Sequence, residues 1–164
     1  MLSTTTMPSP VGDLTIGVSD RGVRFVLWNA SERDLQSTTD AGSPEWREAV
    51  LVRTVAQLDE YFAGTRTEFD LPLDPRGTDF QLSAWTLLRT IPYGQTVSYA
   101  YQARSLGDVR KSRAVGAANG KNPIAIIVPC HRVVGSDGSL TGFGGGLQSK
   151  AWLLDHEKRQ IAIA

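Results

Sequence analysis

Apolar and polar positions alternate in two neighbouring stretches near the start of the chain. The apolar positions are Leu14, Ile16 and Val18 before the polar sequence SDRG, and Val23, Phe25 and Leu27 after it. A period of two places the apolar side chains of an extended segment on one face. A short polar segment between two such runs favours a turn. The pattern therefore predicts a β-hairpin over residues 14–27.

The pattern then changes to helical spacing. Between Glu45 and Phe62 apolar residues recur so that they share one face of an α-helix. Residues 68–73, EFDLPL, alternate again before DPRG interrupts the chain, and we expect an extended segment there. We predict a small α/β domain over residues 1–77. Because it shows no catalytic cluster, we expect it to serve as a scaffold.

A second, mainly helical domain is predicted over residues 78–164, so the fold class we expect is α/β. Its first helix is indicated by TDFQLSAWTLLRTIP, where Thr78 or Asp79 can cap the N-terminus and Pro92 stops the helix. The residues expected on the inward face are Phe80, Ala84, Trp85 and Leu88.

Two short helices follow. The sequence QTVSYAYQARSLG predicts one helix closed by Gly107, and DVRKSRAVGAANG predicts another closed by Gly120. Three or four residues remain for the turn between them. This spacing is typical of a helix-turn-helix.

The second of these helices carries almost no bulk. Its small residues are Ala114, Gly116, Ala117 and Ala118, and its first turns hold Arg110, Lys111 and Arg113. Such a helix either packs tightly inside a core or approaches another surface closely, and the pattern fits both. Reading bases in the major groove would need Arg, Asn or Gln repeated along the helix. These residues are mostly missing, so a contact directed at the minor groove fits better than a sequence-specific repressor.

The run IAIIV, residues 124–128, is typical of a buried strand. Pro129 then forces a turn, which we expect to expose Cys130 at its mouth. A lone cysteine is often an inert core residue. Here, however, His131 and Arg132 follow directly, and both favour the thiolate over the thiol. We therefore predict a reactive thiol.

A third group is needed to orient the imidazole. The sequence LQSKAWLLDHEKR, residues 147–159, predicts a helix with Leu147, Ala151, Leu154 and Lys158 on one face. Glu157, near its end, is either solvated or turned inward. Turned inward, it would complete a Cys–His–Glu relay in which His131 reaches the sulfur through a distorted turn or a bridging water.

Between the cysteine and that helix runs GSDGSLTGFGGGL, with six glycines in thirteen residues and one aromatic, Phe143. A phosphate cradle would require a following Gly-Lys-Ser/Thr, which is absent. Backbone with so little bulk can lie against a flat ligand. We predict that this glycine-rich segment forms a wall beside the thiol, against which a flat ligand can lie.

Composition narrows the function classes. The 164 residues include one Cys and two His, which excludes an internal disulfide and a multi-thiolate zinc site. We predict neither a metal nor a cofactor. No stretch is apolar enough to span a membrane, and the N-terminus lacks the features of a secretory signal. A cytoplasmic protein without a membrane partner is therefore expected.

The net charge of zero conceals an asymmetry. Residues 1–79 hold 7 Lys and Arg against 13 Asp and Glu, and residues 80–164 hold 10 against 4. Clustered cations bind phosphates through counterion release, so the basic half suggests nucleic acid as a partner. Ordinary solvated charge is the alternative.

Several of these segments together resemble one known family. PCHRVVG, with RAVGAANGKNPIAIIV before it and GFGGGLQSKAWLLDHE after it, closely resembles the O6-alkylguanine-DNA alkyltransferases. The resemblance covers residues 78–158, and SPVGDL resembles the more variable first domain. It implies direct DNA repair: an O6-alkylguanine, or an O4-alkylthymine, is flipped from duplex DNA and its alkyl group passes irreversibly to Cys130. It implies no obligate protein partner.

The resemblance also implies residue roles. Cys130 is the acceptor, His131 the water-mediated base, Glu157 its orienting partner and Asn122 the link from the helix-turn-helix to the active-site loop. Arg113 resembles a finger that fills the space of the flipped base, and Tyr99 a residue that promotes rotation and helps protonate the leaving guanine. Further DNA contacts are implied for Lys111, Arg132, Ala114, Gly116 and Ala117. The substrate pocket would include Asn119, Pro129, Val133, Phe143, Gly144 and Gly145.

Two departures from the family matter. Some members carry tyrosine where Phe143 stands, so only ring stacking on the base is left. Some members bind zinc in the first domain through residues that this chain lacks, so zinc is not expected. Two other functions are weighed: a cysteine hydrolase with the same Cys–His–Glu set, and a DNA-binding module without catalysis, which would not need Cys130.

Overall fold

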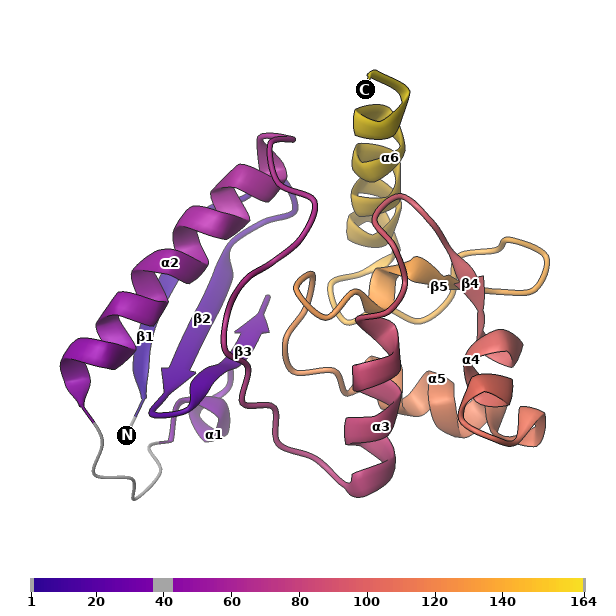
Figure 1. The fold of residues 1–164 in the computed structure, drawn as a ribbon, viewed down its shortest axis with the longest axis horizontal. Helices are drawn as coiled ribbons and strands as arrows, with labels where there is room; N and C mark the ends of the chain where they lie inside the picture. Colours follow the sequence, from indigo (N-terminus) through magenta and orange to yellow (C-terminus); the bar gives the residue numbers. More distant parts are fainter. Residues whose placement is uncertain (1, 37–42, 164) are drawn as a thin grey trace. The chain divides into compact units, whose positions relative to one another are not determined.

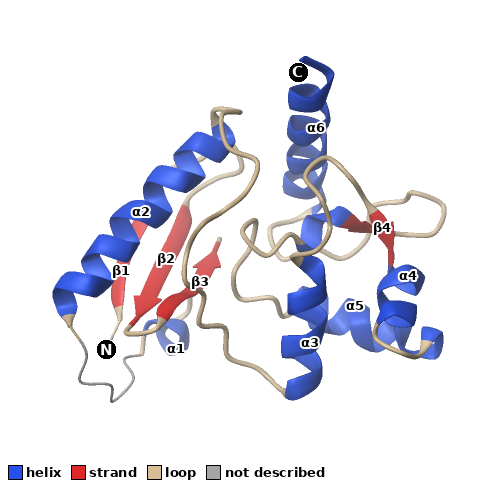
Figure 2. Cartoon of the chain, viewed as in Figure 1, coloured by secondary structure: helices blue, strands red, loops and turns tan. Residues whose placement is uncertain are grey.

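The structure is a computed structural model that describes residues 2–36 and 43–163. Its residues form two compact units, Met1–Arg76 and Gly77–Ala164 (Figure 1). The first combines a sheet with a long helix, and the second is mainly helical (Figure 2). This confirms the predicted α/β fold class. No helix in the described part of the chain is both long and apolar enough to cross a membrane.

The sheet of the first unit has three antiparallel strands in the order β1-β2-β3. They are β1 (Ser3–Met7), β2 (Leu14–Ser19) and β3 (Gly22–Leu27). The predicted hairpin is confirmed as β2–β3, with Ser19 opposite Gly22. β1 was not predicted, because its run of threonines gives no apolar alternation. The segment expected to be extended near EFDLPL forms only a single bridge, between Val23 and Leu73.

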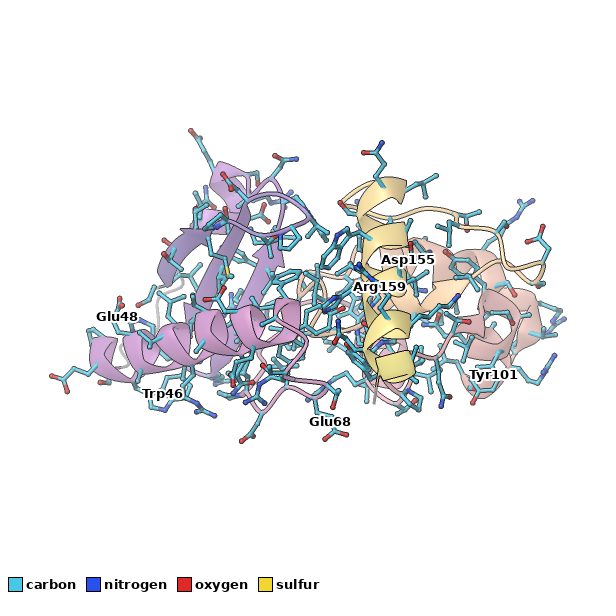
Figure 3. The ribbon with its side chains drawn as sticks, turned by 90° about the horizontal axis from the view of Figure 1, so that it is seen from above. Trp46, Glu48, Glu68, Tyr101, Asp155 and Arg159 are labelled. Carbon is cyan, nitrogen blue, oxygen red and sulfur yellow. The ribbon has the colours of Figure 1, made fainter. Side chains whose placement is uncertain are left out.

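Two helices complete this unit, the short α1 (Glu32–Leu35) and the long α2 (Pro44–Phe62). The Ser43 side chain caps α2, and Pro44 occupies its first turn, where a missing N–H costs nothing. α2 lies along the sheet, as Figure 1 shows, with Val50, Leu58 and Tyr61 buried. Its outer side carries residues such as Trp46 and Glu48 (Figure 3).

The second unit opens with α3 (Asp79–Leu88), and the predicted cap is Thr78. Thr78 and Gln81 form a reciprocal capping box, which satisfies two free backbone N–H groups. Trp85 is buried and its indole N–H donates to the Ala118 carbonyl at 2.8 Å. That bond joins α3 to the next helix pair.

The helix pair is α4 (Tyr99–Ser105) followed by α5 (Ser112–Gly120). Gly107 has a φ of 104°, the left-handed conformation that ends α4 as predicted. The first turn predicted for the second helix is instead a short 3-10 helix, η1 (Val109–Lys111). The two helices are held together by a reciprocal pair of amide hydrogen bonds between Gln102 and Asn119, at 2.9 and 2.8 Å.

The last helix is α6 (Leu147–Ile163). The predicted helix is confirmed, and of the residues predicted to share one face, Leu147 is 50% exposed and Lys158 is also exposed. The fully buried positions are Lys150, Leu153 and Glu157. A helix with one apolar face usually exposes its charged residues, but in α6 Lys150 and Glu157 are buried. Asp155 and Arg159 lie on its exposed side (Figure 3).

Candidate active site

Cys130 is held by two successive tight turns rather than at the end of a strand. Ile127 N–H bonds the Ala125 carbonyl at 2.8 Å around Ile126, whose φ is 73°. Cys130 N–H bonds the Val128 carbonyl at 2.8 Å around Pro129, with φ −83° and ψ 65°. These are γ-turns, and the positive-φ form is rare and strained. The predicted strand over 124–128 is therefore wrong, although the segment is buried as expected.

Asn122, just after the end of α5, holds these turns in place by hydrogen bonds. Its Nδ2 donates to the Val128 carbonyl at 2.8 Å, and its Oδ1 accepts from the Ile124 N–H at 3.0 Å. Asn122 also lowers the pKa of the Cys130 thiol, because its amide can donate to the thiolate. One buried amide thus connects the helix pair to the cysteine.

A short parallel strand pair fixes the other side of the cysteine. β4 (Val97–Ser98) pairs with β5 (Val133–Val134). β4 leads directly into α4, where Ser98 caps the helix and Tyr99 is the first residue. β5 follows the 3-10 helix η2 (Cys130–Arg132). The β4–β5 pairing therefore positions both Tyr99, which directly follows β4, and the η2 segment with Cys130, which directly precedes β5.

The thiol is buried, contrary to the prediction that the turn exposes it. Cys130 is only 8% exposed. Burial raises the pKa of the Cys130 thiol, and the Asn122 hydrogen bond and the positive charge of Lys150 act against that rise. The expected contribution of Arg132 to the thiolate is not found, because its guanidinium bonds elsewhere.

His131 and Glu157 form a fully buried pair. His131 Nε2 lies 2.6 Å from Glu157 Oε2. Burial opposes ionisation of Glu157, but hydrogen bonds from His131 and Arg132 hold the pKa of its carboxyl far below the usual range. An ionised carboxylate can only accept, so Nε2 carries the proton. Nδ1 is then left as the basic nitrogen; it is buried and bonds no other group among the residues described.

Glu157 is surrounded by donors. Oε1 accepts from Arg132 Nε at 2.8 Å and from the Gly94 N–H at 3.0 Å, while Oε2 accepts from Arg132 Nη2 at 3.1 Å. The remaining guanidinium nitrogen, Nη1, donates to the Ile91 carbonyl at 2.7 Å. The prediction that Glu157 turns inward is confirmed.

A cleft of about 600 Å³ lies between α4, α5 and the glycine-rich segment, and Cys130, His131 and Glu157 are not among its lining residues. Its lining residues are Tyr99, Ser112, Arg113, Gly116, Gly120, Thr141, Gly142, Phe143 and Gly144. Backbone and small side chains make up most of the wall, as the glycine content predicts. Its large groups are two aromatic rings, Tyr99 and Phe143, and one arginine, Arg113.

Lys150 connects the cleft to the buried network. Its ammonium group donates to the Thr141 carbonyl at 2.9 Å and lies 5.8 Å from the centre of the Tyr99 ring. The Tyr99 hydroxyl donates to the same carbonyl at 3.1 Å. Lys150 was missed from the sequence, because a lysine within an amphipathic helix is usually solvated. No ion pair to Lys150 is found among the residues of the structure.

Comparison with known proteins identifies the family. The family model of the 6-O-methylguanine DNA methyltransferase ribonuclease-like domain matches residues 2–75, and that of the same family's DNA binding domain matches residues 79–159. The chain belongs to the 6-O-methylguanine DNA methyltransferase family. The two matched regions cover nearly the whole chain.

Individual relatives agree with this family. A methylated-DNA–protein-cysteine methyltransferase of Mycobacterium tuberculosis is 49% identical over 160 residues, covering 96% of this chain and 93% of the relative. One of Methanosarcina barkeri is 43% identical, covering 93% and 95%. The crystal structure of the M. tuberculosis O6-methylguanine methyltransferase has a TM-score of 0.84 at 45% identity, covering 98% and 94%. The M. tuberculosis OGT in complex with DNA has a TM-score of 0.81 at 46% identity, covering 94% and 92%.

Within this family fold, two residues implied by the resemblance lie elsewhere than expected. Arg132, expected at DNA, has a buried side chain that is bonded to Glu157 and Ile91, because a buried carboxylate needs a cation beside it. Asn119, expected in the pocket, pairs with Gln102 between the helices, where a buried amide needs a partner.

The remaining pocket residues divide into two groups. Phe143 and Gly144 line the cleft as expected. Pro129 and Val133 are buried in the segments that hold the cysteine, and neither they nor Gly145 belong to the cleft lining.

The small residues of α5 differ in how far they are exposed. Ala114 and Ala117 are exposed, and Gly116 is half-buried. A side-chain carbon placed on Gly120 would meet nothing within 4 Å, and one on Gly116 would make only ordinary contact with Tyr99. Packing within the protein therefore does not require this side of α5 to be small. The fourth small residue, Ala118, is buried, so at that position α5 packs within its own unit.

Proposed function

We propose that this protein repairs DNA by moving the alkyl group of an O6-alkylguanine, or of an O4-alkylthymine, onto Cys130, once per chain. The observation that carries the proposal is the buried His131–Glu157 pair, whose free Nδ1 belongs to the residue directly after the only cysteine. Family membership and the names of the relatives support it.

The chemistry follows from the hydrogen-bond pattern. Nδ1 of His131 accepts the thiol proton, directly or through one water, and Glu157 stabilises the imidazolium that forms. The sulfur attacks the alkyl carbon, the bond from that carbon to O6 breaks, and its electron pair remains on the guanine. The Tyr99 hydroxyl supports protonation of the leaving base. The product thioether has no carbonyl for water to attack, so the protein is consumed.

Duplex DNA is the proposed partner, approached through its minor groove. The exposed small residues of α5 allow its backbone to lie close to DNA, and Lys111 and Arg113 supply positive charge at its start. The target base must leave the stack to react, which costs a few kcal/mol and least for a weakened pair. Arg113, at the rim of the cleft, would occupy the vacated space.

The cleft provides the base pocket. Phe143 offers a ring for stacking, and the glycine backbone beside it allows a flat base to approach. Asn122 keeps the cysteine loop in place at the end of α5. We place the reaction in the cytoplasm.

Turnover number tests this function against its alternatives. With an excess of duplex carrying one O6-methylguanine, restored guanine should equal, and never exceed, the number of protein chains. Cys130→Ser should bind the duplex and restore no guanine. Repeated turnover would indicate a hydrolase. If neither the wild type nor Cys130→Ser restored guanine, the protein would be a DNA-binding module without catalysis.

A further inference from the structure

Arg132 is in direct contact with the His131–Glu157 pair through Glu157. Its Nε and Nη2 bond the two oxygens of Glu157, at 2.8 and 3.1 Å, and Nη1 bonds the Ile91 carbonyl at 2.7 Å. Its side chain is 7% exposed, and the guanidinium lies 5.6 Å from the centre of the Tyr93 ring. Such a bidentate contact fixes both the position and the rotation of a carboxylate.

The contact also changes the charge that His131 faces. An isolated buried carboxylate at 2.6 Å would strongly favour the imidazolium. With Arg132 on the opposite side, the carboxylate and guanidinium together carry no net charge. Glu157 can then orient the imidazole without keeping it protonated.

We propose that Arg132 is a positioning residue of the alkyl-transfer site, whose guanidinium neutralises and orients Glu157 so that His131 rests as a neutral base. The inference rests on the proposed function for its kinetic consequence, but not for its effect on His131 itself. It also gives a reason why the arginine directly follows the histidine and yet is turned away from solvent.

The other groups around His131 act in both directions. From α6, Glu157 favours the imidazolium, while the Lys150 ammonium disfavours it; from η2, Arg132 disfavours it, and the Cys130 thiol is uncharged at rest. Burial is the largest influence and lowers the pKa of His131, with Arg132 and Lys150 adding to the effect. Removing Arg132 therefore raises the pKa of His131.

The pH dependence of transfer tests this role. The base works only when neutral, so the single-turnover rate rises with pH as His131 loses its proton. In Arg132→Gln this rise should move to higher pH by about one unit, the usual effect of one nearby charge. Arg132→Lys keeps the charge and should keep the wild-type midpoint with a lower maximum rate. Arg47→Gln removes another buried arginine, in the first unit, and should leave the profile unchanged.

A structural role alone predicts a different result. Arg132→Gln would then lose rate equally at every pH, with an unmoved midpoint, and the proposal would be overturned. Imidazole ¹⁵N shifts of the wild-type protein provide a measurement independent of catalysis and of the stability of any variant. They should show His131 as the neutral Nε2–H form well below pH 6.5, its ordinary pKa. Titration at or above that value contradicts the proposal even if alkyl transfer itself is confirmed.

Discussion

At the scale of single residues, the site is defined by an excess of buried positive charge. Arg132 and Lys150 are cationic and Glu157 is anionic, so these three buried groups carry one net positive charge while His131 and Cys130 are neutral. A buried charge without a counterion is costly. When the thiol proton moves to His131 the total charge is unchanged, but the sulfur becomes negative and faces the positive charge of Lys150. The residues around Cys130 are thus arranged for a negative charge that forms only when the reaction begins.

Lys150→Met tests this charge arrangement. Removing the ammonium should raise the pKa of the Cys130 thiol further, because its positive charge opposes the effect of burial. Alkylation of the free protein by iodoacetamide at neutral pH should slow about tenfold if the pKa rises by one unit. Lys158→Met removes an exposed lysine from the same helix and should change nothing. Equal rates for wild type and Lys150→Met would show that Lys150 does not influence the thiol.

At the scale of elements, the turns and helix ends position the chemistry. The two γ-turns fix Cys130, the β4–β5 pair links it to Tyr99, and Asn122 links it to α5. The helices and the hairpin were predictable because burial on one side leaves a periodic pattern. The γ-turns were not, because five consecutive apolar residues read equally as a strand. The burial of Lys150 in α6 was not predicted, because a hydrophobic pattern assigns a charged residue to solvent.

The exposed side of α5 carries a testable consequence of the proposed DNA contact. Ala117→Leu adds bulk where the helix is proposed to approach the minor groove, and affinity for alkylated duplex should fall about tenfold, or about 1.4 kcal/mol. Thermal stability should be unchanged because the position is exposed. The same substitution at exposed Ala49 in α2 is the control. Reaction with free O6-benzylguanine should equal that of the wild type.

Two results would count against this contact. Unchanged duplex affinity in Ala117→Leu would exclude α5 as the DNA-facing helix. An equal loss on duplex and free base would show that the substitution disturbs the pocket instead.

At the scale of the whole molecule, all groups in the proposed chemistry belong to the unit Gly77–Ala164. The sequence shows the same division, since the second half is basic and contains the cysteine. Residue identity and motif spacing could reveal the nucleophile, its base and the glutamate. They could not reveal that Arg132 turns inward or that Lys150 is buried, because both depend on which partners the fold brings near them. Burial of the thiol likewise follows from tertiary packing.

The most direct test of the account is where the alkyl group is found after reaction. The protein is incubated with duplex DNA carrying one O6-methylguanine, and the intact chain and its peptides are analysed by mass spectrometry. The account predicts one added methyl group per chain, located on Cys130, with no further addition when more duplex is supplied. A methyl group on any other residue, or repaired DNA beside an unmodified chain, would contradict it.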